Sequence, residues 1–152
     1  MKFGDIVTAV ASSAVILALL IFPIDMVLVP ALGFFWGLNV GAIVSVLLTA
    51  LIVGYIFAGK IWESRMEAIA KITVLSAVLM AFFVAITLAA TEWPAVVREA
   101  NPGATHTAFE WHIIEHVALL GQIFLNVIIV IVLGFIGLYI GSMFRRPMES
   151  KE

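Results

Sequence analysis

The sequence contains no cysteine, and only 12% of its residues are charged. The absence of cysteine excludes disulfide bonds, thiolate metal sites and thiol–disulfide exchange. Soluble domains usually carry about a quarter of their residues as charges, so a soluble domain is not expected. The eight lysines and arginines are matched by ten aspartates and glutamates and form no basic stripe, which argues against nucleic acid as a partner. No glycine-rich loop that could cradle a phosphate appears, so no nucleotide site is predicted.

Long apolar segments are what the sequence does have. Of its 152 residues 64% are hydrophobic, and the mean hydropathy is +1.20. A membrane-spanning helix needs roughly twenty mostly apolar residues. The sequence therefore predicts an all-α, polytopic membrane protein, with residues 1–152 forming a single four-helix transmembrane bundle. The predicted spans are residues 5–24, 37–59, 68–91 and 108–144.

The connections between these spans follow from prolines, glycines and charges. Pro23, Pro30 and the "GFFWG" segment that begins at Gly33 predict an outer loop at residues 25–36. Charged residues after Gly59 predict a short inner loop, and polar residues with a Pro-Gly turn predict a second outer loop. These two loops are residues 60–67 and 92–107.

The basic residues indicate how the bundle is oriented. In a four-span arrangement, Arg98 is the only lysine or arginine on one side of the membrane. The remaining lysines and arginines fall on the other side, which the positive-inside rule makes cytoplasmic. Both termini are therefore predicted to be cytoplasmic and the protein to lie in the plasma membrane. Tryptophans agree with this orientation: Trp62 marks the inner interface, and the other three mark the outer one. The basic residues on the predicted cytoplasmic side are Lys2, Lys60, Arg65, Lys71, Arg145, Arg146 and Lys151.

The fourth predicted span carries its polar residues on one face. Thr107 and Glu110 have the spacing of a capping box, so the helix is expected to begin at Thr107. Polar amides inside hydrocarbon are costly unless they face other helices, and glycines on a packing face let two backbones approach closely. The polar face should therefore point into the bundle. It consists of His112, Glu115, His116, Gln122, Asn126, Gly134, Gly137 and Gly141.

The other spans carry matching stripes of small and hydroxyl-bearing residues. The bundle interior is therefore expected to be lined by groups of this kind, which also serve as ordinary helix-packing material. The residues predicted to form the polar interior are Gln122, Asn126, Thr87 and Ser76. The residues predicted to pack helices together are Gly37, Gly41, Gly134, Gly137 and Gly141.

The histidines of the fourth span suggest a metal site. His112 and His116 lie one helical turn apart, so both imidazoles can reach one divalent ion of the zinc type, with Glu115 beside them. The order His112-Ile-Ile-Glu115-His116 resembles the H-x-x-E-H signature of inverzincin metalloproteases. Asp25 and Glu92 are candidate further ligands, because both are predicted on the outer side. The alternatives are a purely structural polar turn and a pH-sensing or proton-relaying cluster.

Three functions remain open at this level. The first is a non-enzymatic membrane protein that self-associates or serves as an accessory subunit of a membrane complex, with the lipid bilayer and other membrane subunits as partners. The second is a small transporter or channel-like protein for protons, metal ions or a small solute. The third, ranked last, is a metal-dependent membrane enzyme. The bundle holds no charged residue at mid-membrane, which weighs against coupled transport.

Overall fold

The structure is a computed structural model, and it describes residues 1–145. This part of the chain is helical throughout apart from short turns, and four of its helices are long and apolar enough to cross a membrane. The prediction of an all-helical chain with four helices of this kind is confirmed. The long helices are α1 (Phe3–Leu32), α2 (Phe34–Ile56), α4 (Arg65–Ala90) and α6 (Ala108–Met143), and the short ones are α3 (Ala58–Trp62) and α5 (Trp93–Glu99).

Helix α1 does not end where its prolines predict. It runs through Pro23 and Pro30, so the outer loop predicted at residues 25–36 is wrong. Each proline removes only one backbone donor, and the helix continues through both positions. The chain reverses at Gly33 alone. Its φ of 83° lies in the region that favours glycine, and its N–H donates to the carbonyl of Val29.

The other two predicted loops contain short helices. Helix α3 and the turn after it occupy the connection predicted at residues 60–67, and α5 occupies the first half of the connection predicted at residues 92–107. Helix α6 begins after Thr107, as the capping box predicts: the Glu110 N–H donates to Thr107 Oγ1 at 3.3 Å, and the Thr107 N–H donates to Glu110 Oε2 at 2.7 Å.

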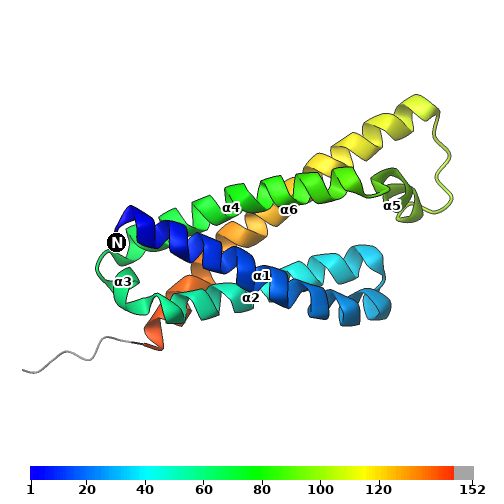
Figure 1. The fold of residues 1–152 in the computed structure, drawn as a ribbon. Helices are drawn as coiled ribbons and strands as arrows, with labels where there is room; N and C mark the ends of the chain where they lie inside the picture. Colours follow the sequence, from blue (N-terminus) through cyan, green and yellow to red (C-terminus); the bar gives the residue numbers. More distant parts are fainter. Residues whose placement is uncertain (146–152) are drawn as a thin grey trace, which may run out of the picture.

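The long helices form two hairpins that pack across each other (Figure 1). Helices α1 and α2 form one hairpin, and α4 and α6, joined through α5, form the other. We call the end that holds Met1, α3 and Phe144 the terminal end, and the end that holds Gly33 and α5 the loop end. The two hairpins separate towards the loop end (Figure 1). At the terminal end the Met1 amino group donates to Ser64 Oγ at 3.1 Å, and Trp62 Nε1 donates to the Ser142 carbonyl at 2.9 Å.

Helices α2 and α6 form the most extensive contact in the bundle. Their backbones approach closely because glycines face the partner helix on both sides. A Cβ atom added at Gly54 would lie 2.6 Å from the carbonyl oxygen of Leu138, and one added at Gly137 would lie 2.6 Å from the Cβ of Ala50. One added at Gly141 would overlap the backbone of α2 in the same way. Only glycine therefore permits this helix spacing.

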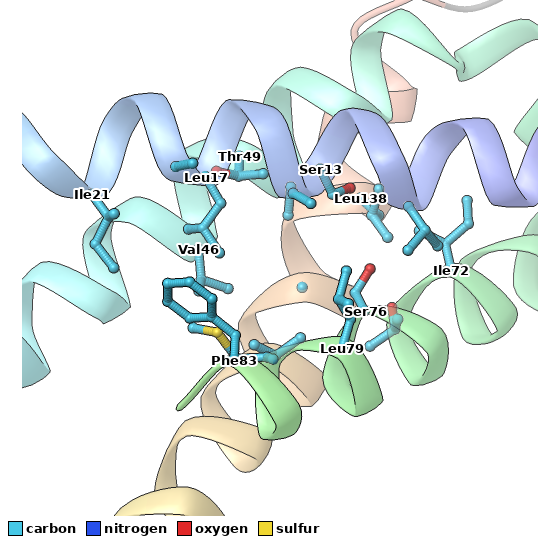
Figure 2. Close-up of a pocket in the computed structure, with 18 residues that line it drawn as sticks. Ser13, Leu17, Ile21, Val46, Thr49, Ile72, Ser76, Leu79, Phe83 and Leu138 are labelled. Atoms are coloured by element: carbon cyan, nitrogen blue, oxygen red, sulfur yellow. The ribbon is translucent and has the colours of Figure 1, made fainter. Parts of the chain in front are cut away.

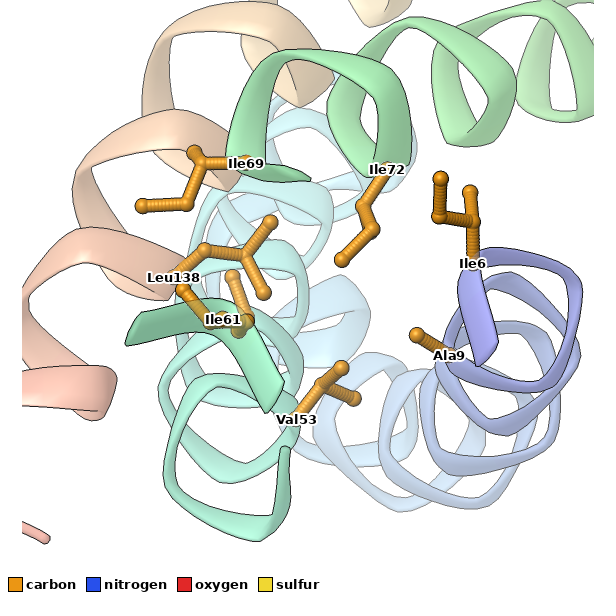
Figure 3. Close-up of a cluster of buried hydrophobic side chains, with 8 residues drawn as sticks. Ile6, Ala9, Val53, Ile61, Ile69, Ile72 and Leu138 are labelled. Carbon is orange, nitrogen blue, oxygen red and sulfur yellow. The ribbon is translucent and has the colours of Figure 1, made fainter. Parts of the chain in front are cut away.

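Two buried apolar clusters fill the bundle. The cluster nearer the terminal end draws on α1, α2, α3, α4 and α6 (Figure 3). The second cluster lies nearer the loop end and joins α2, α4 and α6. Together they hold the two hairpins in one unit. The first consists of Ile6, Ala9, Ala50, Val53, Ile61, Ile69, Ile72 and Leu138, and the second of Val46, Ala77, Met80, Val84, Ile129 and Val130.

Candidate functional site

The two histidines of the predicted metal site lie exposed on α6 at the loop end. The centroids of the His112 and His116 rings are 4.2 Å apart. His116 Nδ1 lies 2.7 Å from the carbonyl oxygen of His112, so its own helix already engages one nitrogen of that ring. Both rings are therefore exposed and not covered by other helices, in contrast to the inward direction predicted for the polar face.

Glu115 is buried against α5 and is already paired. Its side chain is buried, and its Oε1 accepts a hydrogen bond from Arg98 Nε at 2.9 Å. Trp93 Nε1 donates to the backbone carbonyl of Glu115 at 3.0 Å, and the Arg98 guanidinium lies over the Trp111 ring. These contacts fasten α5 to α6. Glu115 is thus occupied in a structural contact between two helices.

The remaining predicted ligands lie elsewhere. Asp25 is in α1 with its carboxylate against Gly41 of α2, and Glu92 is exposed in the turn before α5. Throughout residues 1–145, no three histidine, aspartate or glutamate side chains gather closely enough to hold a metal ion. The structure therefore does not bring together the set predicted from the sequence: His112, His116, Glu115, Asp25 and Glu92.

A chain of amides links α2 to α6. Gln122 Nε2 donates to Asn39 Oδ1 at 2.9 Å, and Asn39 Nδ2 donates to the carbonyl of Phe35. One turn deeper, the buried Asn126 donates to the carbonyl of Gln122. Sequence reasoning placed Gln122 and Asn126 on an inward face but missed their partner. The signal was present in the sequence, because Asn39 is the only amide side chain of the predicted second span.

Thr87 was predicted to lie in the polar interior, and this placement is wrong. Its side chain is exposed, and its hydroxyl donates to the carbonyl of Phe83 in the same helix. Thr87 is on the same face of α4 as Met80 and Val84, which are buried. The face loses its partners beyond Val84 because the two hairpins separate towards the loop end (Figure 1).

A cavity of about 320 Å³ lies between the four long helices. Its walls are mostly apolar, and Figure 2 shows α1 and α4 on its two sides. Leu79 and Phe83 line the cavity and are also 46% and 59% exposed, so the cavity reaches the outer surface of the bundle at these two residues of α4. Helix α1 touches α4 far less than it touches α2, which leaves room for this opening.

Three hydroxyl groups in the cavity wall have no hydrogen-bond partner within residues 1–145. They belong to Thr49 of α2 and to Thr73 and Ser76 of α4. Thr49 and Thr73 are 5% and 3% exposed. A fourth hydroxyl, from Ser13 of α1, donates to the carbonyl of Ala9 at 2.8 Å. The cavity thus combines an apolar wall with unused hydrogen-bonding groups.

Comparison of the chain with protein-family models, with curated proteins and with solved structures finds no match. The fold and the cavity therefore define the class of protein: an apolar four-helix bundle with a cavity between its helices.

Proposed function

We propose that the protein is a non-enzymatic integral membrane protein that binds a lipid-soluble molecule between its four long helices. The observation that carries this proposal is the apolar cavity of about 320 Å³ to which all four helices contribute. Ligand sites in proteins are concave, mostly apolar and of about 300 Å³ or more. The cavity is at the lower end of this range.

The cavity lies at the depth expected for a ligand that comes from the membrane. The ion pair between Asp5 and Lys60 is at the terminal end, where polar groups meet water. Ser13, in the cavity wall, is eight residues further along α1, or about 12 Å at 1.5 Å per residue. The hydrocarbon core is about 30 Å thick, so the cavity falls near its middle. A molecule dissolved in the bilayer would reach it past Leu79 and Phe83.

The chemistry of the wall favours binding over catalysis. The lining contains four hydroxyls, and the rest of it consists of apolar side chains and Gly134. The hydroxyls belong to Ser13, Thr49, Thr73 and Ser76. General acid–base catalysis needs a positioned group that exchanges a proton near neutral pH, and hydroxyls of this kind do not titrate there. The proposed function is therefore to hold an apolar molecule or to let it pass. Binding of such a molecule would also be the first step of transport by a small-solute transporter.

We further propose that the terminal end faces the cytoplasm. Lys60, Arg65 and Arg145 lie at this end, and Arg98 lies at the loop end. Because the chain has no cysteine, single-cysteine variants can report orientation directly. A membrane-impermeant maleimide should label Asn101→Cys in intact cells, and Glu63→Cys only after the membrane is opened. The reverse labelling pattern would contradict this orientation.

The binding proposal is tested by photolabelling with benzophenone, an apolar ketone that attaches to nearby C–H groups under ultraviolet light. The intact protein in lipid nanodiscs is irradiated with benzophenone, and the labelled peptides are identified by mass spectrometry. Met80 lines the cavity and is 5% exposed, whereas Met26 lies on the surface of α1 and is 66% exposed. We expect Met80 to be labelled in preference to Met26. Labelling that follows surface exposure, with Met26 ahead of Met80, would refute the binding site.

A further inference from the structure

We propose that the molecule bound in the cavity carries a carbonyl oxygen on an apolar frame, as a lipid-soluble ketone or quinone does. This inference rests on the proposed function and specifies its ligand. It follows from the three hydroxyls of the wall, Thr49, Thr73 and Ser76, which we call the free hydroxyls.

The free hydroxyls differ from other hydroxyls in the same helices. A serine or threonine in a helix usually satisfies its hydroxyl by donating to the carbonyl four residues earlier. Thr8, Ser13 and Thr87 do this, with oxygen–oxygen distances of 2.8 Å. The free hydroxyls make no such bond to any described residue, although two of them are among the most buried polar side chains of the bundle. The buried Ser45 hydroxyl of α2 also lacks a partner among the described residues, but Ser45 does not line the cavity, so the free hydroxyls are the unpartnered ones in the cavity wall.

A buried hydroxyl without a partner is costly, and inside a membrane water is not at hand to satisfy it. A ligand that accepts a hydrogen bond would remove this cost. A carbonyl oxygen has two lone pairs and no proton, so it can accept from two hydroxyl donors at once. Because serine and threonine hydroxyls can always donate, a carbonyl is the simplest match to a wall that offers several of them.

The positions of the hydroxyls agree with this reading. Ser76 is on α4 and Ser13 on α1, and Figure 2 shows their side chains on opposite sides of the cavity. Thr49 comes from α2, so hydroxyl-bearing residues of three helices line one space. No charged side chain is among the described residues of the wall. A charged ligand would lose its hydration without gaining a counter-ion, which restricts the class to neutral molecules.

The test compares two molecules that differ only in the carbonyl group. Benzophenone has it, and diphenylmethane has a methylene group in its place. Binding to the intact protein in nanodiscs is measured as the shift in thermal unfolding temperature, with both compounds dosed as a mole fraction of lipid. One hydrogen bond of ordinary net strength corresponds to about five- to ten-fold in affinity. We expect benzophenone to bind tighter by this factor.

The variants assign the difference to the free hydroxyls. Thr49→Val, Thr73→Val and Ser76→Ala, combined in one chain, should bring the affinity ratio of the two compounds close to one. The matched control is Thr87→Val, because that hydroxyl is exposed and already bonded within α4. It should leave the ratio unchanged. If the triple variant does not fold, Ser76→Ala alone should still lower the ratio.

The outcomes separate this inference from the proposed function. Equal affinity for both compounds, with Met80 labelled, would overturn the carbonyl class and leave an apolar site of the kind that a lipid acyl chain would fill. A ratio that survives in the triple variant would also overturn it. No saturable binding of either compound, with Met80 unlabelled, would overturn the site itself.

Discussion

Replacing Gly137 by alanine should weaken the bundle, whereas the same replacement at Gly134 should not. Both glycines are in α6, one turn apart. A Cβ added at Gly137 would lie 2.6 Å from the Cβ of Ala50 and 3.1 Å from the carbonyl oxygen of Leu47. A Cβ added at Gly134 would meet nothing closer than the methyl group of Thr73 at 3.7 Å, an ordinary contact.

The magnitude follows from these distances. To restore ordinary contact at Gly137, α2 and α6 must move apart by roughly 1 Å, and a gap of that size forfeits a quarter to a half of the dispersion energy of the atoms concerned. Overpacking of this kind costs about 1–3 kcal/mol. Alanine also stabilises a helix by about 1 kcal/mol relative to glycine. The net expectation is a loss of up to about 2 kcal/mol for Gly137→Ala and a gain of up to about 1 kcal/mol for Gly134→Ala.

The assay is equilibrium unfolding in mixed detergent micelles, followed by tryptophan fluorescence. Both variants and the wild-type protein are measured in parallel. Because both variants gain the same helix propensity, they should differ by the overpacking cost alone, about 1–3 kcal/mol. If Gly137→Ala is as stable as Gly134→Ala, then α2 and α6 are not packed backbone to backbone, and the arrangement of the two hairpins described above is wrong.

Three further substitutions test the contacts that join the helices. Arg98→Ala should destabilise the protein by about 1–2 kcal/mol, because it leaves Glu115 buried without its partner. The loss should be smaller than for a fully buried pair, because Arg98 is half exposed. Thermal unfolding would show the loss, and stability should recover fully when Arg98→Ala is combined with Glu115→Gln. Gln122→Leu should cost about 0.5–2 kcal/mol by breaking the bond to Asn39, and an unchanged midpoint in detergent unfolding would argue against that bond. Thr107→Ala should lower the free energy of unfolding by about 1 kcal/mol through loss of the cap, and it should speed amide hydrogen exchange in the first turn of α6. Unchanged exchange in that turn would contradict the cap.

The number and nature of the long helices could be predicted because length and hydropathy report them directly. A capping box also has a local signature, so the start of α6 at Thr107 could be predicted. Pro23 and Pro30 predicted a helix boundary that α1 does not have, because proline usually marks a helix boundary in water. Inside an apolar helix the cost of leaving backbone groups unbonded outweighs the one donor that Pro23 or Pro30 lacks.

The candidate site could be predicted only in part, because periodicity shows which residues share a face and not which face has a partner. The face of α6 that holds Gln122 and Asn126 also holds His112 and His116. Its deeper part meets α2, but its first turns extend past the point where the hairpins separate, so the histidines are exposed. The cavity depends on the spacing of four helices and has no signature in the sequence.

Self-association of the chain stays a prediction. Two of the glycines predicted to pack helices together are engaged within the chain: a Cβ at Gly37 would lie 2.5 Å from the Cα of Val29, and Gly137 packs on Ala50. These faces are therefore occupied by neighbouring helices of the same chain. Light scattering on the purified protein in detergent would give its oligomeric state.

The most direct test of the account is to fill the cavity and repeat the benzophenone labelling. Ala14 lines the cavity, and the nearby Ala11 is exposed on the same helix and does not. Ala14→Phe should abolish labelling of Met80 while the chain still folds, and Ala11→Phe should leave that labelling as it is in the wild-type protein. Undiminished labelling of Met80 in a folded Ala14→Phe variant would show that the molecule does not bind in this cavity.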